Sequence, residues 1–253
     1  MGESVRSFER GLRVIRAFGA GQADMTLAAV ARETDLNRAT ARRLLLTLEE
    51  LGYIQQRGQQ FRLTPRVLDL GYAYLSSLGL PQLALPYLES LSETLHEASS
   101  VGVLDKTDIV YVARVPAKRV MTVSIGLGSR FPAYRTSLGR AILASLPQHD
   151  IRELWDASDR SDQTPRTVDS VGALLRELEE IRRQGFALVD QELELGVRSI
   201  AAPLHDSSGR TIAAVNVSTH VSRTTKQQLR ARFIPQLLDS ARTIDGVLAN
   251  QLS

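Results

Sequence analysis

The sequence contains no cysteine, no internal repeat and no long run of apolar residues. Without cysteine the chain forms no disulfide, no thiolate zinc site and no thiol nucleophile. None of its apolar stretches approaches the length of a membrane-spanning helix, and its N-terminus lacks the apolar segment of a secretory signal. We therefore expect a cytoplasmic protein with no membrane partner.

Catalytic patterns are scarce as well. The four histidines, His96, His149, His205 and His220, show no metal-ligand spacing and no neighbouring nucleophile motif. Three acids at 190, 192 and 194 alternate, so they share one face if the segment is a strand. We favour a solvated strand end there over a metal or paired-acid site. The sequence therefore predicts no catalytic residue, no metal and no cofactor, and a small-molecule enzyme is the least favoured function.

The composition that remains is ordinary for a globular protein. The chain has 253 residues, of which 43% are hydrophobic and 23% charged, and this length suits two domains. Its net charge of +3 is unevenly distributed. Residues 1–79 hold eleven arginines and eight acids, whereas the remainder holds twenty basic and twenty acidic residues. The positive excess therefore lies in the N-terminal part, as expected if that part neutralises phosphates.

Residues 26–51 predict two short helices joined by a tight turn, with Asn37 as a favourable cap of the second. Apolar residues of the second helix form one stripe at helical spacing: Ala41, Leu44, Leu45 and Leu48. The opposite side suits a DNA major groove, because arginine bonds guanine in bidentate fashion and Ala or Thr contacts a thymine methyl. A solvated helical hairpin is the alternative. The candidate DNA-contacting residues of this helix are Arg38, Ala39, Thr40, Arg42 and Arg43.

Two short strands, at 53–56 and 60–63, are predicted after this helix, around the turn Arg57-Gly58-Gln59. Such a hairpin, or wing, places Arg57 and Arg62 along phosphates or in a minor groove. A first helix precedes the pair, with an apolar side made of Phe8, Leu12, Ile15 and Phe18. Three helices and a wing make a winged helix–turn–helix domain.

Thr64 and Pro65 open a further helix, which we interpret as a linker that ends near Gly79. This helix packs either against the same helix of a second copy in a dimer or against its own domain. Beyond it, strands are predicted at 101–104, 109–115, 121–125, 186–190, 197–204 and 211–219. Helices are predicted at 83–97, 137–146, 148–155, 170–184 with Asp169 as cap, and at the C-terminus with a break near Pro235. This order gives an antiparallel sheet flanked by helices, so the second domain is α+β.

The strand at 211–219 has two different faces. Alternation places Val215 and Val217 on one face and Ala214, Asn216 and Ser218 on the other. The valine face is typical of a core. The small and polar face is typical of a ligand cavity, and a solvent-exposed sheet face is the alternative.

A second candidate element is Tyr134-Arg135-Thr136-Ser137-Leu138-Gly139-Arg140, where a helix begins. The first N–H groups of a helix favour an anion. Arg140 in the first turn is unfavourable for the helix alone, and we expect it to help hold a carboxylate, with Arg135 just outside. The alternative is that both arginines are solvated or pair with acids such as Glu192.

Several segments resemble the IclR family of bacterial transcriptional regulators. They are SVRSFERGLRVIRAF, MTLAAVARETDLNRATARRLLLTLEELGYI, FRLTPRVLDLGYAYL, RFPAYRTSLGRAILA, FALVDQELELGVRSIAAPL and IAAVNVST, which together span nearly the whole chain. The runs FRLTPRVLDLGYAYLSSLGLPQ and IVYVARVP are similar to the subgroup that controls the β-ketoadipate pathway. Its members respond to protocatechuate, 4-hydroxybenzoate or related acids.

The resemblance implies a GAF-like effector-binding domain. Together with the helix start described above, it implies effector contacts at Tyr134, Arg135, Ser137, Leu138, Gly139, Asp190, Ser199, Asn216 and Ser218. Some relatives carry Cys at the position of Ser199 and Ser at that of Asn216, which keeps the site polar but changes the ligand that it suits.

These patterns together predict three parts. Residues 1–64 form a winged helix–turn–helix DNA-binding domain, residues 65–79 a linker helix, and residues 80–253 an effector-binding and oligomerisation domain. The predicted function is a transcriptional regulator of aromatic-acid catabolism genes. Its partners are a double-stranded DNA operator, a small aromatic or keto acid, and further copies of the chain in a homodimer or dimer of dimers. A DNA-binding regulator with a ligand-free structural second domain is the alternative.

Overall fold

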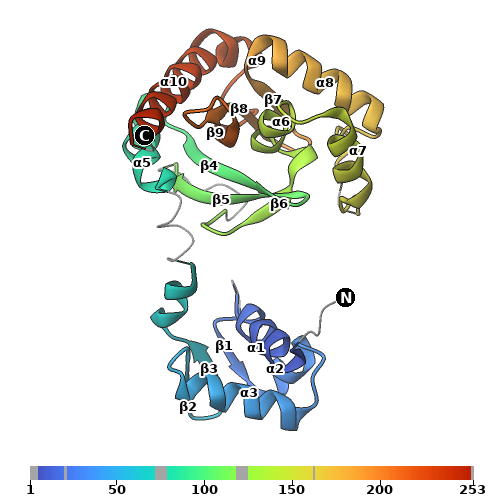
Figure 1. Ribbon diagram of the computed structural model, residues 1–253, viewed down its shortest axis with the longest axis vertical. Helices are drawn as coiled ribbons and strands as arrows, with labels where there is room; N and C mark the ends of the chain where they lie inside the picture. The colour runs from blue at the N-terminus through green and yellow to red at the C-terminus, as the bar shows by residue number, and fades with distance from the viewer. Residues whose placement is uncertain (1–4, 20–21, 72–78, 118–124, 162, 252–253) are drawn as a thin grey trace. The chain divides into compact units, whose positions relative to one another are not determined.

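The computed structural model describes residues 5–19, 22–71, 79–117, 125–161 and 163–251, and Figure 1 shows the course of the chain. The chain divides into two compact units, residues 1–77 and 78–253. Each unit has its own buried core. Among the described residues, no helix is long and apolar enough to cross a membrane.

Up to Leu63, the described part of the first unit contains three helices and a three-stranded sheet (Figure 1). The elements are α1 (Arg6–Ala17), β1 (Asp24–Thr26), α2 (Leu27–Glu33), α3 (Arg38–Glu50), β2 (Ile54–Arg57) and β3 (Gln60–Leu63). The sheet has the order β1-β3-β2 and is antiparallel. The predicted winged helix–turn–helix is confirmed. Strand β1 was not predicted, because three residues before a helix show no periodicity.

The core of the first unit lies where the helices meet the hairpin. Val14 of α1, Val30 of α2 and Leu45 of α3 are fully buried, and Ile54 and Phe61 cover them from the strands. Met25 of β1 lies opposite Phe61, so the short strand adds a further apolar side chain to this core. The packing fixes the side of α3 that faces inward and therefore the side that faces solvent.

The predicted linker helix begins where the sequence indicates. Thr64 Oγ1 accepts a hydrogen bond from Arg66 N at 3.3 Å and caps the 3-10 turn η1 (Pro65–Val67). Residues 68–71 are helical. The rest of the predicted linker, residues 72–78, lies outside the described residues.

The second unit is built on a six-stranded antiparallel sheet of order β6-β5-β4-β9-β8-β7. Its strands are β4 (Ala98–Asp105), β5 (Asp108–Val115), β6 (Arg130–Pro132), β7 (Ala187–Asp190), β8 (Val197–His205) and β9 (Thr211–His220). Its helices are α5 (Leu80–Leu95), α6 (Ser137–Leu143), α7 (Gln148–Ala157), α8 (Val171–Gln184), α9 (Lys226–Gln228) and α10 (Ile234–Gln251). Two short turns complete the unit: η2 (Ala133–Arg135) and the π-helical turn η3 (Leu229–Phe233). The predicted α+β class is confirmed.

Helices cover both faces of this sheet (Figure 1). Helices α5 and α10 pack on one face. Ser99 Oγ of β4 donates to Leu88 O of α5 at 2.8 Å, and this hydrogen bond joins α5 to the sheet. Helix α6 packs on the other face, against β4, β8 and β9. Because Ala214 and Asn216 of β9 lie on the face covered by α6, the small and polar face is enclosed by the protein.

Some boundaries differ from those predicted from the sequence. Strand β6 was not predicted, and most of the predicted strand at 121–125 lies outside the described residues. Ser170 caps α8 by accepting from Ala173 N, whereas Asp169 was the predicted cap. The break predicted near Pro235 does not occur, because the chain stays helical from Lys226 to Gln251 and changes only from the π-helical turn η3 to α10 at Ile234, just before this proline.

Candidate functional site

The outward side of α3 carries the residues that were predicted to contact DNA. Thr40 N donates to Asn37 Oδ1 at 2.8 Å, so Asn37 caps the helix as predicted. Ala41, Leu45 and Leu48 are buried. The residues on the opposite side are exposed, namely Arg38, Ala39, Arg42, Arg43 and Leu46, and Thr40 is half-buried.

The two arginines of the wing differ in their surroundings. Arg57 ends β2 beside the turn and is exposed. Arg62 Nε and Nη2 donate to the carboxylate of Asp24 at 2.8 and 2.5 Å. This hydrogen-bonded pair lowers the pKa of Asp24 and raises the pKa of Arg62. Arg62 therefore already has an anionic partner within the protein, and Arg57 is the better placed of the two to meet a phosphate.

Polar side chains of four strands meet on the sheet face that α6 covers. The strand register places Arg114 of β5 opposite Ser100 of β4, and Ser100 opposite Asn216 of β9. One row further, Ser218 of β9 lies opposite Ser199 of β8. Residues directly opposite each other in antiparallel strands point to the same face. The strand pairing alone therefore gathers these groups over a small area.

Apart from Ser100, these groups line a cavity in the second unit. Four predicted effector residues line it together: Ser137, Ser199, Asn216 and Ser218. The lining also includes residues that were not predicted to contact the effector, namely Tyr111, Arg114, Ile125, Thr136, Val189, Leu193, Glu194 and Val197. The cavity volume is about 20 Å³, which is room for about one water molecule.

Three polar atoms of this cavity are buried without a hydrogen-bond partner among the described residues: Ser137 Oγ, Asn216 Oδ1 and Glu194 Oε2. Asn216 is only 2% exposed, and its Nδ2 donates to Ser218 Oγ at 3.3 Å. The alternative of a solvent-exposed sheet face is therefore wrong. An unpaired buried polar atom costs about 1–3 kcal/mol, so these three atoms require a water or a ligand as a hydrogen-bond partner.

Arg114 brings a positive charge to the cavity. It is half-buried, and its Nη1 donates to Ser100 Oγ at 3.2 Å. Burial lowers the pKa of Arg114, and the described residues provide no carboxylate partner for it. Burial also raises the pKa of the adjacent Tyr111 to about 12, so its hydroxyl stays neutral. The only sequence signal for Arg114 was a single arginine in a largely apolar strand.

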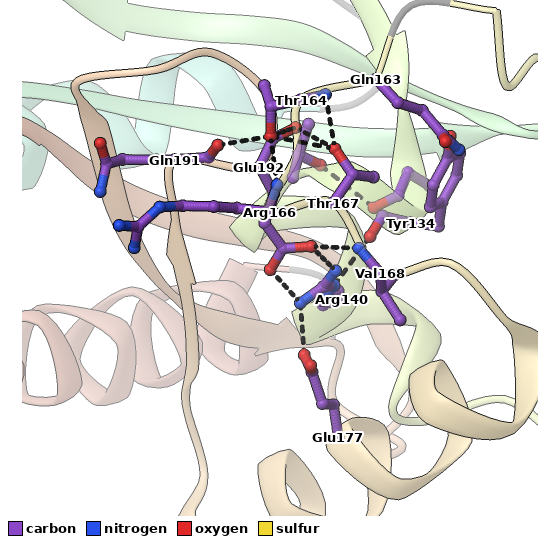
Figure 2. A network of polar contacts seen from close by, with 12 residues as sticks. Tyr134, Arg140, Gln163, Thr164, Arg166, Thr167, Val168, Glu177, Gln191 and Glu192 are labelled. Atoms are coloured by element: carbon purple, nitrogen blue, oxygen red, sulfur yellow. Dashed lines mark hydrogen bonds and ion pairs between the residues drawn. The ribbon is translucent and has the colours of Figure 1, made fainter.

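Arg140 was predicted to help hold a carboxylate ligand, and this prediction is wrong. Its side chain is buried, and Nη1 and Nη2 donate to Glu192 at 2.8 and 2.5 Å. Its Nε donates to Tyr134 O at 2.7 Å, and a further ion pair joins it to Glu177. Figure 2 shows Arg140 between the two carboxylates, with Val168 N donating to Glu192 at 2.9 Å. The alternative pairing with Glu192 is therefore confirmed.

The same network extends from Arg140 and Glu192 to Thr164, Thr167 and Gln191 (Figure 2). The hydroxyl of Thr164 donates to Gln191 O at 2.8 Å, and the hydroxyl of Thr167 donates to Glu192 O at 2.8 Å. Residues 191 and 192 lead directly into Leu193 and Glu194, which line the cavity. Helix α6, the loop at 164–168 and this part of the lining are thus linked by buried polar contacts.

Asp190 is not part of the cavity lining. Its carboxylate accepts from Arg198 Nε at 2.8 Å and lies 3.0 Å from Lys226 Nζ. Burial alone would raise the pKa of Asp190, but the hydrogen bonds from Arg198 and Lys226 outweigh it and lower the pKa to about 2. The structure therefore gives Asp190 a role in joining β7, β8 and α9, away from the lining residues.

The remaining predicted residues lie behind the lining. Tyr134 packs edge-on against Trp155 with ring centroids 5.0 Å apart, and Leu138 is fully buried in the core. Arg135 is buried as well. Gly139 is required by packing, because an added Cβ would lie 2.0 Å from a backbone carbonyl oxygen. These residues shape the start of α6 rather than the surface of the cavity.

The three alternating acids do not form a common site. Asp190 pairs with Arg198, Glu192 pairs with Arg140, and Glu194 lines the cavity. Residues 191–196 form a turn, with positive φ at Gln191 and Gly196, and not the strand end that was expected. Among the described residues, no group of three histidines or acids is arranged to hold a metal ion.

A winged helix–turn–helix unit followed by an α+β unit with an enclosed polar cavity is the architecture of a bacterial transcriptional regulator. The chain belongs to the IclR family. Residues 7–58 match the IclR helix-turn-helix domain, and residues 72–246 match the C-terminal domain of the bacterial transcriptional regulator IclR.

Three proteins show how close the similarity is. The Pca regulon regulatory protein of Pseudomonas putida is 44% identical over 239 residues, which are 94% of this chain and 82% of that protein. The crystal structure of a regulator protein from Rhodococcus sp. RHA1 is 50% identical with a TM-score of 0.88, and covers 98% of this chain and 99% of its own. The inducer-binding domain of the PobR transcription factor from Acinetobacter, solved as a double mutant with 3-hydroxybenzoic acid, is 30% identical. Its TM-score is 0.61, over 66% of this chain and 98% of its own.

Proposed function

We propose that this chain regulates genes for the breakdown of an aromatic acid and is itself controlled by a small aromatic carboxylate. Operator DNA binds to α3 and the wing, and the carboxylate binds in the cavity of the second unit. The names of two similar proteins support this ligand class, since one regulates a Pca regulon and the other was solved with 3-hydroxybenzoic acid. We place the activity in the cytoplasm, where bacterial operator DNA lies, and assign it no catalytic step, cofactor or metal.

The observation that carries the ligand proposal is the set of polar groups in the cavity. Burying a carboxylate without partners is costly, so a site for an acid must supply a cation or hydrogen-bond donors. Arg114 supplies the cation, and Ser137 Oγ supplies a hydroxyl whose partner is missing among the described residues. Val189 and Leu193 supply apolar surface for a ring. Arg114 thus takes the role that the sequence assigned to Arg135 and Arg140.

The small size of the cavity supports control by the ligand. A volume of about 20 Å³ does not hold an aromatic ring, so the acid must separate the lining side chains when it binds. The acid therefore binds one arrangement of the second unit more tightly than the other. That difference in affinity is what an effector needs in order to shift a conformational equilibrium.

The DNA-binding proposal rests on the exposed side of α3. Arg42 and Arg43 face solvent together with Ala39, a combination that can read guanine and thymine edges in a major groove. Arg38 and Thr40 lie in the first turn of the helix, where phosphate contacts are common. We assign Arg57 to a phosphate contact. Arg62 contributes less to DNA binding, because its guanidinium already donates to Asp24.

We further propose that the chain acts as a homodimer or dimer of dimers. The first unit has an apolar groove of about 480 Å³ lined by side chains of α1 and α3 together with Leu51, Tyr53 and Leu70. Four of its apolar residues are exposed: Phe8 by 68%, Leu12 by 42%, Leu51 by 50% and Leu70 by 52%. A contiguous apolar surface of this kind typically marks an interface between proteins. A second copy would also bring two copies of α3 to a palindromic operator.

Thermal unfolding of the full chain with a panel of acids tests the ligand proposal. We expect protocatechuate and 4-hydroxybenzoate to raise the melting temperature, and benzyl alcohols of the same shape to leave it unchanged. At free ligand 100-fold above its Kd, the stabilisation is about 2.7 kcal/mol. Arg114→Gln removes the cation, so it should abolish the effect of every acid.

The matched control is Arg176→Gln, which removes an exposed arginine from α8. This variant should respond to acids as the natural protein does. Neutral analogues that stabilise as well as acids would contradict the carboxylate assignment. If no acid stabilises the protein, the second unit has a purely structural role. Footprinting on the DNA upstream of the protein's own gene, with and without the acids, then tests whether binding of the ligand changes binding of the operator.

A further inference from the structure

An acidic side chain lies on the outer face of the sheet that forms the wing. The strand register places Asp24 of β1 opposite Arg62 of β3, and Arg62 opposite Gln55 of β2. The neighbouring pair, Met25 and Phe61, points into the core. Because successive residues of a strand alternate between the two faces, Asp24 and Arg62 point to the outer face. Their side chains are 32% and 43% exposed, so both are accessible to DNA.

Asp24 binds the guanidinium of Arg62 through two hydrogen bonds. Nε and Nη2 of Arg62 donate to the two carboxylate oxygens at 2.8 and 2.5 Å. An arginine binds a phosphate with the same bidentate geometry. The hydrogen bonds from Arg62 lower the pKa of Asp24 most, and the charge of Arg57 lowers it further, so the acid stays ionised beside both arginines of the wing. A carboxylate of the protein therefore uses the donors that a phosphate would use.

This ion pair contributes little to the stability of the fold. Water and salt screen the charges of an exposed pair, so its net contribution is small. The backbone pairing of β1 with β3 and the contact of Met25 with Phe61 already hold the short strand in place. The main effect of Asp24 therefore falls on the positive charge that the wing presents to DNA.

We propose that Asp24 competes with DNA phosphates for Arg62 and thereby lowers the affinity of the chain for DNA of every sequence. This proposal rests on the proposed function, because it concerns the same DNA-binding surface. A phosphate that binds Arg62 must displace a carboxylate that offers the same kind of charge and acceptor atoms. Phosphate contacts supply the part of the binding free energy that does not depend on sequence. By weakening this part, Asp24 gives the base contacts of α3 a larger share of the total.

Replacement of the acid by its amide tests the competition. Asp24→Asn keeps the shape of the side chain and removes its charge, so Arg62 becomes available to a phosphate. We expect Kd to fall roughly fivefold, the upper end for an exposed ion pair, both for random-sequence DNA and for DNA from upstream of the protein's own gene. The slope of log Kd against log salt should steepen by about 0.9, which corresponds to one additional phosphate contact. Fluorescence anisotropy of labelled DNA at several salt concentrations measures both quantities.

Variants of Arg62 show whether the gain in affinity depends on this arginine. Arg62→Ala alone should leave the salt slope close to that of the natural protein, because Asp24 keeps Arg62 from the phosphates. In the Arg62→Ala background, Asp24→Asn should improve Kd by no more than roughly twofold and leave the slope unchanged. A gain as large as the one in the natural background would show that Asp24 acts without Arg62, and would overturn the proposal.

Glu9→Gln is the matched control for the loss of one negative charge. Glu9 also forms an exposed ion pair with an arginine, because its carboxylate accepts from Arg13 Nη2 at 3.0 Å. This pair lies on α1, which packs against α2 and α3. The control variant should keep the natural Kd and salt slope. If it gains as much affinity as Asp24→Asn, the loss of any acid tightens DNA binding and the proposal is wrong.

The direction of the change distinguishes competition from support. If Asp24 instead orients Arg62 toward DNA, Asp24→Asn weakens binding, and this proposal fails while the proposed function stands. An unchanged Kd and salt slope would have the same consequence. If the natural protein binds neither DNA in a salt-sensitive way, the proposed function fails as well.

Thermal unfolding shows whether the variants remain folded. The melting temperature of Asp24→Asn should lie close to that of the natural protein, because the pair is exposed. If Asp24→Asn does not fold, Arg62→Ala decides the question alone. A salt slope that is shallower by about 0.9 in Arg62→Ala would show that Arg62 already neutralises a phosphate, and would overturn the proposal. An unchanged slope would support it.

Discussion

The exposed arginines of the first unit are expected to contribute to DNA binding in different ways. Arg43→Ala should weaken binding to the operator by about 1–3 kcal/mol and relax the preference at one base pair, because it removes a bidentate contact to a base. Arg57→Ala should weaken binding to all sequences alike and reduce the salt slope by about 0.9, which corresponds to one phosphate contact. Binding to operator and random DNA at several salt concentrations measures both effects.

Arg62→Ala serves as the comparison within the wing. Because Arg62 pairs with Asp24, its removal should weaken DNA binding less than the removal of Arg57. An equal loss on operator and random DNA for Arg43→Ala would contradict its assignment as a base-reading residue. Leu46, 40% exposed on the same side of α3, has no assigned contact.

Single residues were predictable from the sequence where their role depends on local neighbours. Asn37 caps α3 because its side chain reaches the backbone three residues ahead. Asn216 was found because strand alternation separates it from the valines beside it. Arg114 and Glu194 were not assigned, because only the register of the sheet and the turn at 191–196 bring them to the cavity. Arg140 was misassigned because its partner Glu192 is distant in sequence.

At the scale of elements, the buried contacts between α6 and the turn at 191–196 are expected to be important for stability. Glu192→Gln leaves the buried Arg140 with only the half-exposed Glu177 as a charged partner, so the free energy of unfolding of the second unit should fall by about 3–5 kcal/mol. Glu177→Gln should cost less than about 1 kcal/mol, because the Glu177 side chain is 48% exposed. Urea unfolding measures both, and equal losses would contradict the buried assignment.

A double variant tests the same prediction by removing both charges of the buried ion pair. Arg140→Met combined with Glu192→Leu removes both charges and should recover much of the stability that Glu192→Gln loses. The Glu192→Gln variant should also bind aromatic acids more weakly, because residues 191 and 192 hold Glu194 in the wall of the cavity. A variant that loses stability but keeps the natural affinity for acids would show that the wall is held by other contacts.

Elements with a clear period or cap were predictable, and short elements were not. Helix α3 and the hairpin of β2 and β3 follow from the apolar stripe and the turn at Gly58. Strands β1 and β6 have three residues each, too few for a pattern, and only pairing with β3 and β5 makes them strands. The order of the strands in the sheet could not be predicted from the sequence either, because hydrophobic alternation does not show which strands are neighbours.

At the scale of the whole molecule, we propose that the two units divide the two binding activities. The formal charge supports this division, because residues 1–79 carry the whole excess of +3 and the remainder is neutral. Phosphate binding depends on such an excess. The second unit has its own sheet, its own core and the cavity with Arg114. Among the residues that the structure describes, the core and the lining of the cavity both come from the second unit.

We therefore expect residues 80–253 alone to fold, to associate and to bind aromatic acids, but not to bind DNA. Calorimetry with 3,4-dihydroxybenzoate should give a Kd close to that of the full chain, because every lining residue of the cavity is retained. Gel retardation with operator DNA should show no complex at any salt concentration. If the fragment retards DNA in a salt-sensitive way, phosphate-binding groups lie in the second unit and the division is wrong. If the fragment folds but no longer binds the acid, the cavity needs the first unit in order to adopt the arrangement that binds the ligand.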